Sequence, residues 1–267
     1  MSTILITGST DGIGLETAHH LAGLGHRLVL HGRDPAKLEH TRLAIEAEQS
    51  DAVAAEALAD LSNLTDVDRL ATATTELGID VVVNNAGVFR TSRPITDDGL
   101  DVRFVVNTIA PYLLTRRLLA TLPADGRVIN LSSAAQAPVD LDALAGLVSL
   151  DGDNAYAQSK LALTMWSRHL ADQIGQDGPA IIAVNPGSLL ATKMVKEGYG
   201  IAGNDIRIGA DILTRASLSD EFADATGRYF DNDAGRFGQP HPDALDPNKN
   251  AAIVAAIDDV LSRITTS

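Results

Sequence analysis

Short runs of β-branched residues and leucine alternate along the chain with longer segments in which apolar residues recur at helical spacing. The short runs predict strands over residues 3–7, 27–31, 52–56, 81–84, 127–131, 180–185 and 228–230. The longer segments predict helices over residues 13–24, 35–48, 66–77, 100–122, 155–174 and 251–263. This alternation is typical of an α/β fold, a doubly wound parallel sheet of about seven strands with helices on both faces.

Neither a linker nor a repeat divides this pattern. The 267 residues are enough for one large core, so we expect a single domain over residues 1–267. One helix start is explicit, because Asp34 can cap the helix and Pro35 suits its first position. The stretch 199–247, rich in glycine, asparagine, aspartate and proline, is the least regular part, and we expect surface structure there.

Charge and composition exclude several classes of protein. The 35 acidic and 21 basic residues give a net charge of -14, a field that repels nucleic acid and anionic membranes. No apolar run is long enough for a membrane span, and the first residues lack the features of a secretion signal. The chain has no cysteine, and no histidine spacing suits a metal ion, so we expect a cytoplasmic protein without a metal site.

The first predicted strand leads through a glycine-rich turn directly into the first helix. The turn consists of Thr7, Gly8, Ser9, Thr10, Asp11, Gly12, Ile13 and Gly14. In this arrangement backbone N–H groups and the helix dipole can meet a pyrophosphate, and glycine permits its close approach. The turn lacks the Gly-Lys-Ser/Thr of a triphosphate-binding loop, so the predicted ligand is a dinucleotide. A tight turn that binds nothing is the alternative.

The end of the second strand indicates which dinucleotide binds. An acid at this place binds a ribose 2′-hydroxyl, whereas an arginine accepts a 2′-phosphate. Gly32 stands where the acid would be and Arg33 follows it, which favours NADP(H) over NAD(H). The nearest acid, Asp34, is explained as a helix cap. Asp11 moderates the preference, because it stands where a second basic residue would help.

Candidate chemistry lies on the helix predicted over residues 155–174. Tyr156 and Lys160 are four residues apart, so both side chains lie on one helix face. A tyrosine ordinarily titrates near about 10, and a close ammonium favours the phenolate. The pair therefore suits an acid/base that works nearer neutral pH. A solvated helix face with the same spacing by chance is the alternative.

Further motifs follow the predicted strands and helices in a fixed order. They are Asp60, Asn84-Asn85-Ala86-Gly87, Asn107, Ser132-Ser133 and Asn185-Pro186-Gly187. Together with the glycine turn and the tyrosine–lysine pair, they make residues 3–192 resemble the short-chain dehydrogenase/reductase family. The resemblance implies a Rossmann-type fold and hydride transfer between a nicotinamide and a carbonyl or alcohol carbon.

The resemblance also implies roles for individual residues. Ser133 would bind the substrate oxygen and Tyr156 would exchange its proton. Lys160 would hold the nicotinamide ribose and lower the pKa of the tyrosine, while Asn107 would keep a relay water in place. The implied cofactor contacts, besides the turn, Arg33, Tyr156 and Lys160, are Asp60, Leu61, Asn85, Ala86, Gly87, Pro186, Gly187 and Thr192. For the serine pair, capping of the strand end is the alternative.

Two departures from the family pattern concern the mouth of the site. From Ser133 to Tyr156 is 23 residues, more than is common in the family, which resembles the retinol-dehydrogenase-like branch. We expect the insert 134–154 to form an extra turn near the mouth. Thr192 comes one position late after Pro186-Gly187. A substrate loop is expected around residues 189–245, where an apolar lid or ordinary packing explains Leu189, Leu190, Met194, Val195 and Tyr199.

The sequence therefore predicts an NADP(H)-dependent oxidoreductase for a hydrophobic small-molecule carbonyl or alcohol. The family resemblance implies a homodimer or homotetramer, packed through the helices after Leu100 and Ala155. One alternative is an NADP-binding sensor or scaffold without chemistry. Another, a nucleotide-sugar epimerase or dehydratase, normally needs a larger C-terminal domain. The 75 residues after Thr192 better suit a substrate loop, one more helix–strand unit and a last helix.

Overall fold

A computed structural model describes residues 1–265, apart from the side chains of Tyr199 and Thr265. Its centre is a sheet with the order β3-β2-β1-β4-β5-β6-β7-β8. The strands are β1 (Thr3–Ile6), β2 (Arg27–Gly32), β3 (Val53–Leu58), β4 (Val81–Asn84), β5 (Arg127–Leu131), β6 (Ala180–Asn185), β7 (Tyr229–Asp231) and β8 (Arg236–Gly238). Strands β1 to β7 pair in parallel and β8 is antiparallel to β7, which confirms the predicted α/β class.

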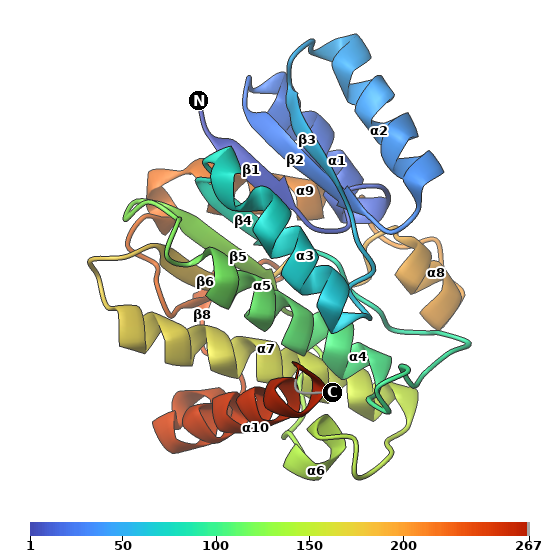
Figure 1. Ribbon diagram of the computed structural model, residues 1–267, viewed down its shortest axis with the longest axis vertical. Coiled ribbons are helices and arrows are strands. Elements are labelled where there is room, and N and C mark those ends of the chain that lie inside the picture. Colours follow the sequence, from blue (N-terminus) through green and yellow to red (C-terminus); the bar gives the residue numbers. More distant parts are fainter. Residues whose placement is uncertain (266–267) are drawn as a thin grey trace.

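Helices cover both faces of this sheet (Figure 1). One face carries α1 (Gly12–Gly23), α2 (Pro35–Glu48) and α9 (Arg207–Leu218). The other carries α3 (Leu64–Thr74), α5 (Ala110–Leu118) and α7 (Gly152–Ile174), with α10 (Pro247–Thr265) packed on α7. The shorter elements are η1 (Thr75–Leu77), α4 (Val102–Phe104), the π-helix η2 (Val105–Ile109), α6 (Leu141–Leu144), α8 (Lys193–Tyr199), η3 (Asp220–Phe222) and η4 (Pro242–Leu245).

The central strands are buried on both sides, so alternate residues serve two separate cores. Ile4 and Ile6 of β1 pack on the side of α1, α2 and α9, whereas Leu5 packs on the side of α3, α5 and α7. All three side chains are fully buried. The two apolar layers, one on each face of the sheet, thus fix the positions of the central strands. The carboxyl ends of these strands form one edge of the sheet.

Capping aspartates fix where several helices begin. Asp34 accepts hydrogen bonds from the backbone N–H of Ala36 and Lys37 at 2.9 and 3.1 Å, which confirms its predicted role. At α7, Asp151 accepts from the N–H groups of Asp153 and Asn154, so this helix begins three residues earlier than predicted. The earlier start places a full turn of helix before Tyr156.

One predicted helix was wrong in detail, and the range of another helix was not predicted. The helix predicted over 100–122 is three elements, α4, η2 and α5, because Asp101 caps its start and a π-helical stretch interrupts it. Within the stretch 199–247, predicted as the least regular part, the range of one helix was not predicted: α9 over Arg207–Leu218. Ile212 and Leu213 of α9 are buried at 1% and 0% exposure, and α9 packs against α1. With β7 it forms the predicted additional helix–strand unit.

The C-terminal helix α10 covers the outer side of α7 (Figure 1). Tyr112 of α5 donates a hydrogen bond to Asp258 of α10 at 2.9 Å, so α5 contacts the same helix. The helices through which the resemblance implies packing between copies are therefore partly covered by this chain itself. Across residues 1–265, no helix has the length and apolarity to cross a membrane.

Candidate active site

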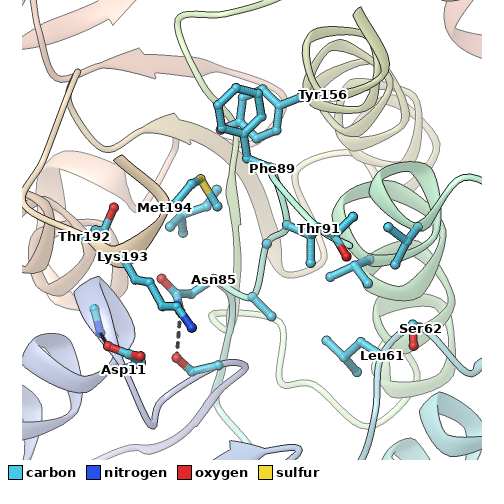
Figure 2. A pocket seen from close by; sticks show the side chains of 18 of the residues that line it. Asp11, Leu61, Ser62, Asn85, Phe89, Thr91, Tyr156, Thr192, Lys193 and Met194 are labelled. Carbon is cyan, nitrogen blue, oxygen red and sulfur yellow. Dashed lines mark hydrogen bonds between the residues drawn. The ribbon is translucent and has the colours of Figure 1, made fainter. Parts of the chain in front are cut away.

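A cleft of about 1840 Å³ opens at the carboxyl ends of the parallel strands, where the strand order reverses between β1 and β4. Figure 2 shows its interior. The predicted site residues that line it are Gly8, Thr10, Asp11, Gly12, Ile13, Arg33, Asp60, Leu61, Asn85, Ala86, Gly87, Ser133, Tyr156, Lys160, Pro186, Gly187 and Thr192. Four predicted residues, Thr7, Ser9, Gly14 and Asn107, lie behind the lining.

Thr7 and Ser9 hold the glycine turn in place from behind. The Thr7 hydroxyl accepts from the N–H groups of Asn85 and Ala86 at 3.0 and 3.1 Å, and its own proton goes to the Val83 carbonyl. The Ser9 hydroxyl donates to the carbonyl of His31 and accepts from its N–H. Both hydroxyls are buried, so in this structure they tie the turn to β4 and β2 rather than face the cleft.

The turn fits a pyrophosphate on the evidence of its glycines. Gly8 and Gly12 have φ of +66° and +57°, a region that disfavours other residues. A Cβ on Gly14 would lie 2.3 Å from both the Gly8 carbonyl oxygen and Asn85 Nδ2, so the turn closes only around glycine. Asn85 Nδ2 donates to the carbonyls of Thr7 and Gly8. The turn is thus preformed beside the start of α1, as an anion site requires.

His31, which the sequence did not single out, joins three strand ends at this site. Its Nδ1 accepts the Gly8 N–H at 3.0 Å, so its Nε2 carries the proton and donates to the Ala59 carbonyl at 3.2 Å. Burial lowers the pKa of His31 to about 4. The ring is therefore neutral at pH 7, and it holds the glycine turn against the segment that follows β3.

At the end of β2 the cleft is lined by Arg33, and position 32 lacks an acid. A Cβ on Gly32 would lie 2.7 Å from the Thr10 methyl carbon, so Thr10 occupies the space that an acidic side chain would need. Arg33 lies at the rim of the cleft and is exposed. This packing gives Gly32 a structural reason that the sequence alone did not reveal.

Asp60 and Leu61 form the neighbouring wall. The Asp60 carboxylate accepts from both the N–H and the hydroxyl of Ser62 at 2.9 and 2.7 Å, which fixes its orientation. Leu61 is 6% exposed but still lines the cleft. An oriented carboxylate beside an apolar side chain suits a purine ring, which offers an amino donor and an apolar face.

Tyr156 and Lys160 lie one turn apart on α7 at the inner end of the cleft. Lys160 Nζ is 5.8 Å from the centroid of the Tyr156 ring and donates to the Leu131 carbonyl at 2.7 Å. The lysine is 4% exposed, and burial lowers its pKa to about 8. Because this pKa is above 7, the ammonium persists at neutral pH and favours the phenolate of the neighbouring tyrosine.

The two serines after β5 have different surroundings. Ser132 is 3% exposed, and its hydroxyl meets the Thr164 hydroxyl at 2.7 Å and the Lys160 carbonyl at 3.3 Å. Ser133 is partly exposed in the cleft, where its hydroxyl accepts the Ala135 N–H at 3.1 Å and retains its proton for another partner. This arrangement supports Ser133 rather than Ser132 as the substrate-binding serine.

Asn107 lies in the π-helix η2, and its side chain is fully engaged. Its Oδ1 accepts the Val88 N–H at 2.7 Å, and its Nδ2 donates to the Val88 carbonyl and the Ser159 hydroxyl. A Cβ on Gly87 would lie 3.4 Å from this Oδ1 and 3.6 Å from Lys160 Nζ. Asn107 thus fixes the strand end beside the lysine. These side-chain contacts leave little capacity for a water, so its predicted relay role stays a prediction.

Phe89, which lies beside Tyr156, and α8 contribute apolar side chains to the lining of the cleft. The Phe89 and Tyr156 rings lie 4.8 Å apart, and Figure 2 shows Phe89 directly against the tyrosine. A Cβ on Gly198 of α8 would lie 2.6 Å from Phe89 Cε1, so the lid helix touches this ring closely. The Met194 methyl reaches within 3.7 Å of the Cβ position of Gly87. The sequence did not reveal Phe89, because it lies in a loop, two positions after the Asn84-Asn85-Ala86-Gly87 motif.

The predicted lid residues divide between packing and the cleft. Leu190 and Val195 are buried, whereas Leu189 is 43% exposed at φ +53°. The side chain of Tyr199 lies outside the described residues. Thr192 caps α8 by accepting the Val195 N–H at 3.2 Å, and it also lines the cleft. Figure 2 shows Lys193 and Met194 following it at the same rim.

The insert forms its extra turn away from the mouth. Within residues 134–154, Ala134 and Ala135 line the cleft, but the expected extra turn is α6, which packs against α10. Asp140 caps α6, and Ala143 and Leu144 are 2% and 0% exposed. The expectation of a turn at the mouth was therefore wrong, because Ala143 and Leu144 are buried on the side of α10, whereas Leu141 and Leu147 are exposed.

The sheet, the glycine turn and the tyrosine–lysine pair define the class of protein as an NAD(P)-dependent oxidoreductase. A family model described as short chain dehydrogenase matches residues 2–199. The chain belongs to the short-chain dehydrogenase/reductase family, whose members act on CH–OH and C=O groups.

Individual relatives agree with this assignment. Human retinol dehydrogenase 13 is 31% identical over 259 residues, which covers 86% of this chain and 76% of that protein. This confirms the predicted likeness to the retinol-dehydrogenase branch. The structure of an uncharacterized protein from Mycobacterium paratuberculosis matches with TM-score 0.80 at 26% identity, covering 97% of this chain and 93% of that one. A short chain dehydrogenase from Burkholderia cenocepacia in complex with NADP matches with TM-score 0.68 at 26% identity, covering 87% and 96%.

Proposed function

We propose that the protein is an NADP(H)-dependent oxidoreductase that interconverts a carbonyl and an alcohol on an apolar small molecule, with Tyr156 as its acid/base. The observation that carries this proposal is the buried Lys160 ammonium beside the Tyr156 ring at the inner end of the cleft. A sensor or scaffold that binds NADP without chemistry would have no use for this pair, because burying an ammonium is costly.

Four residues of the site have separate tasks in this reaction. A bound nicotinamide supplies or accepts the hydride. Ser133 donates a hydrogen bond from its hydroxyl to the substrate oxygen and so holds that oxygen near Tyr156. Tyr156 gives its Oη proton to that oxygen during reduction and takes it back during oxidation. Lys160, fixed on the Leu131 carbonyl, favours the phenolate that remains. Asn107 holds the Val88 backbone next to this pair.

Arg33 tests the proposed preference for NADP(H). We expect Arg33→Asp to weaken NADPH binding at least about tenfold and to leave NADH binding nearly unchanged, because one charge-assisted hydrogen bond contributes about 1.5–3 kcal/mol. Fluorescence titration of the purified protein with each dinucleotide measures both dissociation constants. Arg236, an exposed arginine on β8 outside the cleft lining, provides a matched control. Equal loss of both dinucleotides would contradict the preference.

A group of apolar side chains in the cleft, here called the apolar wall, supports a hydrophobic substrate. Phe89, Met194 and Leu189 line this side of the cleft, and retinol, for which the human relative is named, is an apolar alcohol. We expect Phe89→Ala to lower kcat/KM about tenfold for a bulky apolar carbonyl, because it removes an aromatic contact surface. A small aldehyde, which cannot span the wall, should lose less than threefold. Initial rates with the two substrates measure both losses. Equal losses of kcat/KM would contradict the proposal that the apolar wall contacts the substrate.

The remaining assignments are proposals of wider scope. We propose that residues 1–267 form one catalytic domain with its substrate loop around residues 189–245. A homodimer or homotetramer also stays a prediction. Since α10 covers the outer side of α7, a contact between copies would use other surfaces as well. Light scattering of the purified chain would detect a dimer or tetramer from its mass. The cytoplasmic location expected from the composition likewise stays a prediction.

A further inference from the structure

A second cation, Lys37, lines the same cleft as Arg33 and lies four residues further along the chain. Lys37 stands on the first turn of α2, where the Asp34 carboxylate accepts its backbone N–H at 3.1 Å. Its Nζ lies 3.6 Å from Asp11 Oδ2 in the glycine turn. Both side chains line the same cleft as Arg33, and more than half of each is exposed. The ion pair therefore spans the rim between the glycine turn and α2.

The two oxygens of Asp11 have separate partners. Oδ1 accepts the Gly12 N–H at 2.8 Å and caps α1, whereas Oδ2 faces Lys37. The carboxylate thus stands where it would repel a phosphate, and at the same time it holds an ammonium that would attract one. A 2′-phosphate carries about 1.5 to 2 negative charges at pH 7, so Arg33 alone cannot neutralise it.

We propose that Lys37 is the second phosphate-binding cation, and that Asp11 holds its ammonium until the 2′-phosphate takes it over. The Asp11–Lys37 pair then sets how strongly the enzyme prefers NADP(H) to NAD(H). This inference rests on the proposed use of NADP(H). Arg33 and Asp34 line the same cleft, and the N–H groups of Ala36 and Lys37 already engage the Asp34 carboxylate.

Three variants separate this role from that of an ordinary surface ion pair. Lys37→Ala removes the cation. Asp11→Asn removes the charge but keeps an oxygen for the Gly12 N–H, since asparagine caps helices about as well as aspartate. The double variant measures the coupling between the two residues. Lys249→Ala is the matched control, because Lys249 also pairs with an aspartate, Asp243, but lies outside the cleft lining.

Fluorescence titration with NADPH and NADH gives a pair of dissociation constants for every variant. We expect Lys37→Ala to weaken NADPH about fivefold to tenfold and NADH less than twofold. Asp11→Asn should tighten NADPH about threefold or more, with a smaller gain in the double variant. Raising the salt concentration should reduce both effects. Lys249→Ala should change neither constant.

The outcomes distinguish this inference from the proposal on which it rests. If Arg33→Asp weakens NADPH selectively but Lys37→Ala changes both dinucleotides equally or neither, the role of Lys37 is wrong and the NADP(H) proposal stands. If the unmodified protein binds NADH as tightly as NADPH and Arg33→Asp changes nothing, both fail. An undiminished gain from Asp11→Asn in the Lys37→Ala background would show repulsion alone and would overturn the proposed hold on Lys37.

Discussion

Replacing Tyr156 with phenylalanine is expected to lower kcat by about 10²–10⁴-fold, because a positioned acid/base contributes a factor of that size. Phenylalanine keeps the ring that packs 4.8 Å from Phe89 and removes the Oη that exchanges a proton. NADPH binding should therefore change less than twofold. The measurement is the initial rate of NADPH oxidation with a carbonyl compound that the unmodified enzyme reduces, together with a fluorescence titration of NADPH.

Tyr112→Phe is the matched control for this experiment. Tyr112 also loses a hydroxyl, but it lies on α5, where it donates to Asp258 of α10, outside the lining of the cleft. We expect its kcat to remain within about twofold, with a small loss of stability from two hydrogen bonds, one to Asp258 and one from Arg116. If Tyr156→Phe kept more than a tenth of the unmodified kcat, or if both variants lost activity equally, Tyr156 would not be the acid/base.

The strands and the tyrosine–lysine pair could be predicted because their signals are local. The bounds of Val81–Asn84, Arg127–Leu131 and Ala180–Asn185 agree with the prediction, since runs buried on both faces are apolar at nearly every position. Tyr156 and Lys160 meet because residues four apart share a helix face. Both predictions depend only on neighbouring residues in the sequence, and not on which part of the fold packs against the strand or the helix.

The features that the sequence did not reveal depend on distant contacts. His31 bonds to Gly8 and Ala59, which are 23 and 28 residues away, so its role follows from the pairing of β1, β2 and β3. The insert was placed wrongly for the same reason, since α6, with the buried Leu144, packs against α10, more than 100 residues later. An additional helix–strand unit was predicted after Thr192, but flanking glycines and aspartates obscured the bounds of its helix α9, whose apolar face is buried against α1.

His31 also gives the protein a definite dependence of stability on pH. Burial lowers its folded-state pKa from 6.5 to about 4, so between these values the unfolded chain binds more protons than the folded one. The free energy of unfolding should therefore fall as the pH drops through this window, and His31 should contribute about 3 kcal/mol to the loss between pH 7.5 and pH 4. Above about pH 7.5 its contribution is fully present.

His31→Asn isolates this contribution. Asparagine Oδ1 can accept the Gly8 N–H as His31 Nδ1 does, but the amide does not titrate. In urea unfolding at pH 7.5, 5.5 and 4.5, the unmodified protein should lose about 2 kcal/mol or more relative to His31→Asn on acidification. His40→Asn, at an exposed position on α2, should follow the unmodified protein. Parallel pH curves for His31→Asn and the unmodified protein would mean that the histidine is not held neutral between the glycine turn and Ala59.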